Sequence, residues 1–422
     1  MGIKTYNMAK IKHRVIFCIA FYTLMIGCST QPTASSSEHP VVIPAAAAEA
    51  VTTACKKWRF FPQAHISHVS LSKNAKHVLV STSDPLRAQL LTKQGKVKWS
   101  RPLKQPVRAQ AISESGDLIA LSTYDNKLQV FDSSGRKKWE REHLGRPIIL
   151  ERKKLVLLFN DDDADAKTAF ITYDFSGRKV GEVKASRFEP LEMAIAENQE
   201  FVALIGSKGN ITTYATEGKP LWQELTSKGS GAIALTANPN PRVFALGAKE
   251  LSGFELGSSK KWVNLWKTSL KRRFETIKPV GNAVFLYGNS QQGQALAALD
   301  ATTGKLLWER FYPLPANYSS LVFTNSSSQT SAKEPLRQYA SVAIDDGVQA
   351  GMLQILGVNL QGNALWKAAI EAESGIYSYD LSSKPEALVV GAGEPGNGFI
   401  EFYRFEKGLC GKTNKNSPPL KF

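Results

Sequence analysis

The sequence is poor in the residues that most often build metal sites and nucleophilic sites. All six of its histidines lie at or before position 143, and none of its four cysteines forms a Cys-x-x-Cys pair. No His-Glu-x-x-His motif is present, so we do not expect a zinc site. No Gly-x-Ser-x-Gly elbow occurs, and the glycines near 228–231 and 391–398 do not form a phosphate loop. The motifs of zinc enzymes, serine hydrolases and phosphate-loop proteins are therefore missing.

Long apolar runs are also scarce. The apolar run near the N-terminus, residues 15–27, has 13 residues, whereas a membrane-spanning helix needs about 20. It follows four basic residues and ends in Leu24-Met25-Ile26-Gly27-Cys28, which resembles a bacterial lipobox. We expect residues 1–27 to be a lipoprotein signal peptide and Cys28 to carry acyl groups. The alternative is an ordinary signal peptide with an incidental cysteine. Ser29 is not the aspartate that retains lipoproteins in the inner membrane of enteric bacteria, which favours the outer membrane.

Composition divides the rest of the chain into three segments. Residues 28–54 are rich in Ser, Thr, Pro and Ala and nearly uncharged, which is typical of a flexible tether. Residues 55–410 form the predicted folded domain, and residues 411–422 a C-terminal tail. The folded segment is long for a single domain, but a fold that grows by repetition tolerates such a length.

A glycine followed four residues later by a tryptophan recurs along the folded segment. Five pairs have this spacing: Gly95 and Trp99, Gly135 and Trp139, Gly218 and Trp222, Gly304 and Trp308, and Gly362 and Trp366. Two further copies are degraded, since Gly181 takes the tryptophan position after Gly177 and Ser258 takes the glycine position before Trp262. Successive copies lie about 40 residues apart, with a longer interval before Trp366. We therefore interpret the motif as a structural repeat.

The period and the strand pattern predict the architecture. Residues 108–139 read as four short strands separated by turns at Ser115-Gly116, residues 124–127 and residues 132–135. A four-stranded unit of about 40 residues fits a propeller blade, whereas helical repeats of that length need amphipathic helices. We predict an all-β, eight-bladed propeller of four-stranded antiparallel sheets, with seven blades as the alternative. Each tryptophan is expected on the outermost strand, buried against the neighbouring blade and worth a few kcal/mol.

The best copy of the repeat, Ala298–Trp308, follows the pattern Ala-x-Asp-x-x-x-Gly-x-x-x-Trp. This pattern resembles the tryptophan-docking motif of the quinoprotein (PQQ-like) β-propeller repeats, and the match extends over roughly residues 55–410. The resemblance implies a propeller fold. The wider superfamily includes cofactor-dependent dehydrogenases and also non-catalytic lipoproteins, such as the propeller lipoprotein of the outer-membrane β-barrel assembly machinery.

The two ends of the repeat region are expected to meet. Residues 399–405 read as a third strand, residues 406–408 as its turn, and residues 56–60 as the fourth strand of the same blade. Cys18 is removed with the signal peptide and Cys28 is the predicted lipid site, which leaves Cys55 and Cys410 at the two ends. In an exported chain we expect them to form a disulfide that fastens the closing blade. The alternative is two unpaired, buried thiols.

Two groups of polar residues have side chains that could bind a metal. Carboxylates at 161, 163 and 165 resemble the start of a calcium loop, but Ala166 replaces the turn glycine and Thr172 the closing glutamate. A solvated acidic turn is the better interpretation. His65 and His68 are three apart, which in a strand places them on opposite faces, so both are expected to be structural or exposed. The quinoprotein dehydrogenases often use adjacent cysteines, which this chain lacks. We expect no catalytic residue, cofactor or metal.

The charge balance favours anionic partners. The net charge of +16 falls to +12 without residues 1–27, which hold four basic residues and no acidic ones. Basic residues gather at 136–138, 152–154 and 267–273. Anionic lipid, lipopolysaccharide or an acidic protein surface would suit such a chain, and nucleic acid is not expected in the envelope. A lysine-rich soluble surface is the alternative.

These features together predict a non-catalytic envelope lipoprotein. We expect a lipid-anchored scaffold for protein–protein interactions at the outer membrane, facing the periplasm, that works as a monomer within a complex. Its expected partners are envelope proteins, including an integral outer-membrane protein, and its role is expected in outer-membrane protein assembly. A quinoprotein-like enzyme or small-ligand-binding propeller is the alternative, and a surface sensor or adhesin is a third hypothesis. The insert at 325–333 is either a partner contact or a neutral surface loop.

Overall fold

The computed structural model describes fifteen stretches of the chain, all within one compact unit, Ala46–Phe422. The described residues are 52–160, 168–185, 190–206, 209–225, 231–236, 240–257, 261–290, 293–312, 321–324, 339–345, 351–358, 364–372, 376–383, 386–393 and 396–407. Strands dominate them, and the helical segment among them is one turn of 3-10 helix, η1 (Glu151–Lys153). None of the described helical residues forms a segment with the length and apolarity needed to cross a membrane.

The described strands form eight antiparallel sheets of four strands each, which we call blades 1 to 8. Blade 1 has β2 (His65–Leu71), β3 (His77–Asp84), β4 (Leu86–Thr92) and β5 (Val97–Pro102). Blade 2 has β6 (Val107–Ile112), β7 (Leu118–Thr123), β8 (Lys127–Asp132) and β9 (Lys137–Glu142). Blade 3 has β10 (Arg146–Leu150), β11 (Leu155–Phe159), β12 (Thr168–Asp174) and β13 (Lys179–Lys184). Blade 4 has β14 (Pro190–Ile195), β15 (Phe201–Gly206), β16 (Asn210–Ala215) and β17 (Pro220–Leu225).

The second half of the chain repeats this plan. Blade 5 has β18 (Ala232–Thr236), β19 (Arg242–Leu246), β20 (Glu250–Leu256) and β21 (Trp262–Ser269). Blade 6 has β22 (Thr276–Val280), β23 (Ala283–Ser290), β24 (Gly293–Asp300) and β25 (Leu306–Tyr312). Blade 7 has β26 (Leu321–Thr324), β27 (Tyr339–Asp345), β28 (Gly351–Val358) and β29 (Ala364–Ala372). Blade 8 has β30 (Ile376–Ser383), β31 (Glu386–Ala392), β32 (Phe399–Lys407) and, from the other end of the chain, β1 (Thr52–Phe60).

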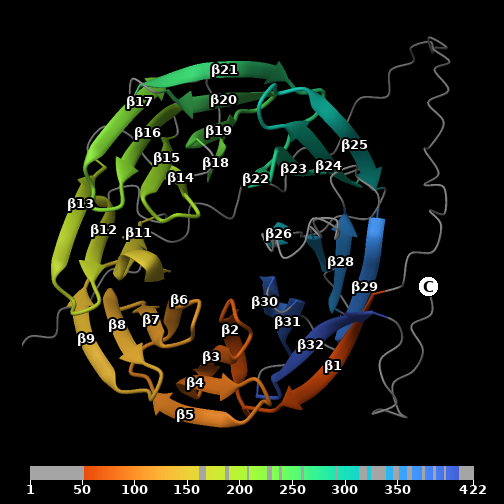
Figure 1. The fold of residues 1–422 in the computed structure, drawn as a ribbon. Coiled ribbons are helices and arrows are strands. Elements are labelled where there is room, and N and C mark those ends of the chain that lie inside the picture. Colours follow the sequence, from red (N-terminus) through yellow and green to blue (C-terminus); the bar gives the residue numbers. More distant parts are fainter. Residues whose placement is uncertain are drawn as a thin grey trace, which may run out of the picture. The chain divides into compact units, whose positions relative to one another are not determined.

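Within this unit the blades are arranged as a ring, with the first strand of each blade near the centre and the fourth at the rim (Figure 1). The predicted all-β propeller of four-stranded antiparallel sheets is confirmed. The eight sheets correspond to the larger of the two blade numbers that the repeats allowed. Adjacent blades share buried apolar clusters, so the ring is held by inter-blade packing as well as by strand pairing.

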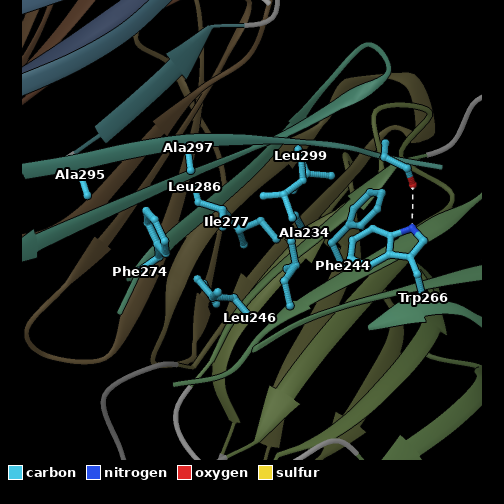
Figure 2. Close-up of a cluster of buried hydrophobic side chains, with 14 residues drawn as sticks. Ala234, Phe244, Leu246, Trp266, Phe274, Ile277, Leu286, Ala295, Ala297 and Leu299 are labelled. Carbon is cyan, nitrogen blue, oxygen red and sulfur yellow. Dashed lines mark hydrogen bonds between the residues drawn. The ribbon is translucent and has the colours of Figure 1, made fainter. Parts of the chain in front are cut away.

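The cluster between blades 5 and 6 shows how the packing works (Figure 2). Phe244 of β19 and Trp266 of β21 come from one blade, and Leu286 and Leu299 come from the facing sheet of the next. All four side chains are buried, and burying one such side chain stabilises a fold by roughly 1.5–3 kcal/mol. The indole of Trp266 also donates its N–H to the carbonyl of Ala301 at 3.3 Å.

The N-terminal strand closes the ring, as predicted. β1 pairs antiparallel with β32 and completes the sheet of blade 8. Two details of the prediction were wrong. β1 begins at Thr52, inside the segment assigned to the tether, and β32 continues through Lys407, where a turn was expected. Glu406 and Lys407 pair with Thr53 and Thr52, so the two ends of the repeat region form a longer ladder than the sequence pattern indicated.

Candidate functional site

The repeat glycines and tryptophans meet across blade junctions and not within one turn. In four of the described rim turns, the turn glycine lies against the tryptophan of the preceding blade. Each of these glycines has a positive φ, and a β-carbon added to Gly135 would lie 2.8 Å from Cγ of Trp99. The same contact joins Gly95 with Trp58, Gly177 with Trp139, and Gly304 with Trp266. The glycine is therefore required both for the turn and for the close approach of the indole.

In the part of the chain that the structure describes, the remaining copies of the repeat do not show this contact between a turn glycine and a tryptophan. Gly181, which replaces a tryptophan, lies against the backbone of Glu217, and a β-carbon on Gly218 would meet only the backbone of Glu182. Trp222 instead contacts the rings of Trp262 and Phe254 at 5.4 and 5.3 Å. Trp308 is buried in β25 with its ring 5.7 Å from that of Phe285. Gly362 lies outside the described residues, and Trp366 belongs to β29.

Strand direction gives the ring two unlike faces. Because neighbouring strands are antiparallel, the blade-to-blade connections and the turns between second and third strands lie on one face, which we call face A. The turns between first and second strands and those between third and fourth strands lie on the opposite face, which we call face B.

The turns of face B are bonded to one another. The backbone N–H of Asn74 in blade 1 donates to the carbonyl of Glu114 in blade 2 at 3.3 Å. The N–H of Ser115 donates to the Glu151 carboxylate of blade 3 at 3.1 Å, and the N–H of Arg152 donates to the side chain of Gln199 in blade 4 at 2.8 Å. The tryptophans of the rim strands also pack against turns of face B. Many residues of face B therefore make contacts between blades.

Among the residues whose burial the structure describes, the exposed aromatic side chains lie on face A. Phe61 follows β1 and is 59% exposed, Tyr124 lies in the β7–β8 turn and is 66% exposed, and Tyr377 begins β30 and is 46% exposed. Phe311, near the end of β25, is the fourth. By contrast, six exposed aliphatic residues lie in the first two positions of rim strands, at the face B end: Val97, Val180, Leu221, Val263, Leu306 and Leu307. The two faces therefore differ in chemistry as well as in connectivity.

Part of the aromatic surface is gathered where the ring closes. The guanidinium of Arg59 lies 4.4 Å from the ring centre of Phe399 and 5.9 Å from that of Phe61. At the face A end of the same junction, the ring of His65 in blade 1 meets that of Tyr377 in blade 8 at 4.8 Å, edge to face. Exposed aromatic rings next to arginine are the composition most enriched at the centres of protein interfaces. We call this group, Arg59, Phe61, His65, Tyr377 and Phe399, the closing cluster.

The buried carboxylate of Glu401 holds Arg59 of the closing cluster in place. The Glu401 carboxylate of β32 accepts hydrogen bonds from Lys56 at 3.0 Å and Arg59 at 2.6 Å, both in β1, and from the hydroxyl of Tyr403. Burial alone raises the pKa of Glu401, but these three donors outweigh it and hold the pKa below its usual value. Glu401 is therefore a negative charge inside the closing blade that binds β1 to β32.

Of the residues considered as metal ligands from the sequence, the structure describes His65 and His68. His65 lies 2.8 Å from the hydroxyl of Ser83, and His68 lies 3.2 Å from the carbonyl of Val107. Burial lowers the pKa of His68. No group of three potential metal ligands occurs within the part of the chain that the structure describes. The acidic residues 161–165 and Cys28 lie outside the described residues.

Cys55 lies in β1, where it is buried and disulfide-bonded. Cys410 lies outside the described residues, so its pairing with Cys55 remains a prediction. Sequence reasoning missed the closing cluster. One signal was available, since Phe61 directly follows the strand that closes the ring and Tyr124 stands in a turn on the same face. Both are large apolar residues where polar ones are usual.

Comparison with known proteins agrees with the fold. A family model described as outer membrane protein assembly factor BamB matches residues 52–224 and 207–394. The crystal structure of BamB from Moraxella catarrhalis is 16% identical, with a TM-score of 0.58, over 83% of this chain and 100% of that one. The C-terminal WD40 domain of Sif2 is 11% identical, with a TM-score of 0.60, over 84% of this chain and 99% of that one.

At 16% and 11% sequence identity, these two structural similarities show a shared fold and no more. A search of curated proteins found no match. The family model, however, covers well over half of the chain, and its repeats are the ones that carry the docked tryptophans. The resemblance to PQQ-like propeller repeats is therefore confirmed, and the chain belongs to the family of the outer membrane protein assembly factor BamB.

Proposed function

We propose that the chain is a non-catalytic envelope lipoprotein that serves as a scaffold in the assembly of outer-membrane proteins. In this proposal face A docks against a protein partner, with the closing cluster at the centre of the contact. The observation that carries it is the location of the exposed aromatic side chains on face A. The turns of face B, by contrast, are hydrogen-bonded to the turns of neighbouring blades. The family match supports the role in assembly.

The closing cluster has the properties of an interface centre. Phe61 and Tyr377 present exposed rings with few rotatable bonds, so little conformational entropy is lost when a partner covers them. Arg59 is held by Glu401 at 2.5 Å and is therefore ordered before binding. Truncating residues of this kind in a desolvated contact typically costs 2 kcal/mol or more, which is about thirtyfold in affinity.

The proposed location follows from the N-terminal segment. Acylation at Cys28 and a tether over residues 28–54 would hold the propeller at the membrane, and the residue after the cysteine favours the outer membrane. Since β1 runs from face B to face A, the tether joins the propeller on the face B side. Face A would then point away from the point of attachment, toward partners in the periplasm.

Photocrosslinking in intact envelopes tests the proposal. A benzophenone amino acid placed at Phe61 or Tyr124 should give adducts with an envelope protein, identified by mass spectrometry, including an integral outer-membrane protein. The matched controls are Val97 and Leu221, which are 44% and 43% exposed but lie at the face B ends of rim strands. Equal adduct yields from both sets would overturn the assignment of face A. If the purified chain bound a quinone with calcium and reduced a dye when given an alcohol or sugar, the non-catalytic assignment would be wrong.

A further inference from the structure

The rim of the closing junction contains a groove that differs from the other tryptophan junctions. It has a volume of about 450 Å³ and lies between blade 8 and the β4–β5 turn of blade 1. Its lining residues are Lys57, Trp58, Lys93, Gln94, Phe402 and Arg404. Three of these six are cations and none is an acid. We call it the Trp58 groove.

Trp58 is more accessible than its counterparts. Trp99, Trp139 and Trp266 occupy the equivalent places and are buried, whereas Trp58 is only half-buried. Phe402 stacks on its indole at 5.3 Å with the rings nearly parallel, and Gly95 lies against the ring atoms. The indole N–H donates to the carbonyl of Lys93 at 2.9 Å. With the ring faces covered, the edge of the indole meets the groove, and the edge is the electropositive part of an aromatic ring.

A single substitution in the repeat explains why the β4–β5 turn contributes no negative charge to this groove. The equivalent turns of blades 2 and 3 begin with Asp132 and Asp174, and each aspartate pairs with an arginine of its own turn at 3.1 Å. In blade 1 the first residue is Thr92, whose hydroxyl accepts the turn N–H groups of Gln94 and Lys96 in place of a carboxylate. The turn keeps its shape, but its lysines face no carboxylate of the turn.

The groove also lies on the side where the chain enters the propeller. β1 starts at Thr52 on the face B side, and the β4–β5 turn belongs to face B. The segment between Cys28 and Thr52, residues 29–51, has 23 residues, and a flexible chain of that length spans about 27 Å on average. If Cys28 is acylated, the tether holds the groove within easy reach of the membrane surface.

From this charge, position and tether length, we propose that the Trp58 groove binds the phosphate headgroups of anionic lipids and docks the rim of the closing junction on the membrane surface. Lys93 and Arg404 would contact the headgroups. Lys56 and Arg59 would not contribute, because Glu401 neutralises them. Each basic residue near an anionic bilayer strengthens binding by roughly fivefold. The inference rests on the proposed envelope location, but it does not depend on the scaffold role or on face A.

Vesicle binding by the purified, unlipidated mature chain (Cys28→Ser) tests the inference. Flotation should show binding to phosphatidylethanolamine vesicles containing a quarter phosphatidylglycerol, little binding to phosphatidylethanolamine–phosphatidylcholine vesicles, and loss of binding in high salt. The variant Lys93→Gln/Arg404→Gln should bind at least tenfold more weakly. Its control, Lys138→Gln/Arg178→Gln, removes the same charge at the Trp139 junction and should change binding less than threefold.

Lys93→Glu alone provides a second variant, because the fold uses the backbone carbonyl of Lys93 and that side chain lies exposed in a turn. It should also weaken binding at least tenfold while leaving the thermal midpoint unchanged. Equal losses in the groove variant and its control, or equal binding to both kinds of vesicle, would overturn the proposal. So would an absence of vesicle binding together with crosslinks from position 93 to an acidic protein segment. The vesicle experiments do not depend on the crosslinks from face A. Failure of the lipid-binding proposal can therefore be distinguished from failure of the proposed scaffold function.

Discussion

Substituting Gly135 tests whether the ring depends on the contact between turn glycines and tryptophans. Gly135→Ala places a methyl group 2.8 Å from Cγ of Trp99, closer than van der Waals contact, at a backbone φ of +80°. Trp99 has little room to retreat, because it is buried and its ring stacks with that of Phe131 at 6.3 Å. The left-handed backbone costs about 1–2 kcal/mol for alanine, and overpacking adds roughly 1–3 kcal/mol. The free energy of unfolding should therefore fall by about 2–5 kcal/mol.

Gly396→Ala is the matched control. Gly396 has a φ of +84°, but nothing lies within 4 Å of the place where its β-carbon would be. This variant therefore carries the backbone cost alone, about 1–2 kcal/mol. Equilibrium urea unfolding of the two variants and the parent should separate the packing cost from the conformational cost.

A double-mutant cycle completes the test. In a Trp99→Leu background the indole is absent, so Gly135→Ala should cost no more than Gly396→Ala, and the coupling energy should be about 1–3 kcal/mol. If Gly135→Ala and Gly396→Ala are equally destabilising in the parent, or if the cycle shows no coupling, the tryptophans do not act as wedges on the turn glycines.

Four further predictions concern the closing blade and the anchor. Glu401→Gln should lower the free energy of unfolding by about 2–3 kcal/mol and speed hydrogen exchange in β1, because two cations lose a buried carboxylate. Burial raises the pKa of Asp380 to about 6, so its contribution to stability is present below pH 4 and is lost as the pH rises through 6. Asp380→Asn should remove this part of the pH dependence. The change in the free energy of unfolding between pH 4 and pH 7, measured by urea unfolding, should shrink by at most about 3 kcal/mol. Non-reducing peptide mapping should find Cys55 linked to Cys410, and Cys410→Ser should destabilise the chain by up to about 5 kcal/mol. Cys28→Ser should abolish palmitate labelling and release the protein from the membrane fraction.

The architecture was predictable because several independent features of the repeat indicate the same four-stranded blade. Strand alternation, turn residues and a constant period agree in most copies, so the loss of Trp at Gly181 did not obscure blade 3. What the spacing did not reveal is that Gly135 contacts Trp99 and not Trp139. A motif within one turn suggests a contact within that turn, whereas the strand carries each tryptophan toward the next blade. In the four junctions where a turn glycine meets a tryptophan, the two residues therefore come from different blades.

The ends of the closing strands were harder to place. Thr52–Ala54 belong to β1 although their composition continues that of the tether, because pairing with residues 405–407 recruits them into the ladder. Long-range pairing of this kind overrides local composition. For the same reason the closing cluster was not predicted, since Arg59 and Phe399 lie far apart in the chain and become neighbours only when the ring closes.

Closure of the ring also explains why both proposed surfaces lie at one junction. In most blades whose strands come from consecutive sequence, the rim turn repeats the same residue types, and those positions are used for packing. At the closing junction two distant segments meet, and there the pattern departs from the consensus: Thr92 replaces the turn aspartate, Trp58 stays half-buried, and Phe61 is exposed. Glu401 supplies an ionic bond there that strengthens strand pairing. Because that bond and the β1–β32 ladder hold the junction, its rim and its face A end are free to carry binding chemistry.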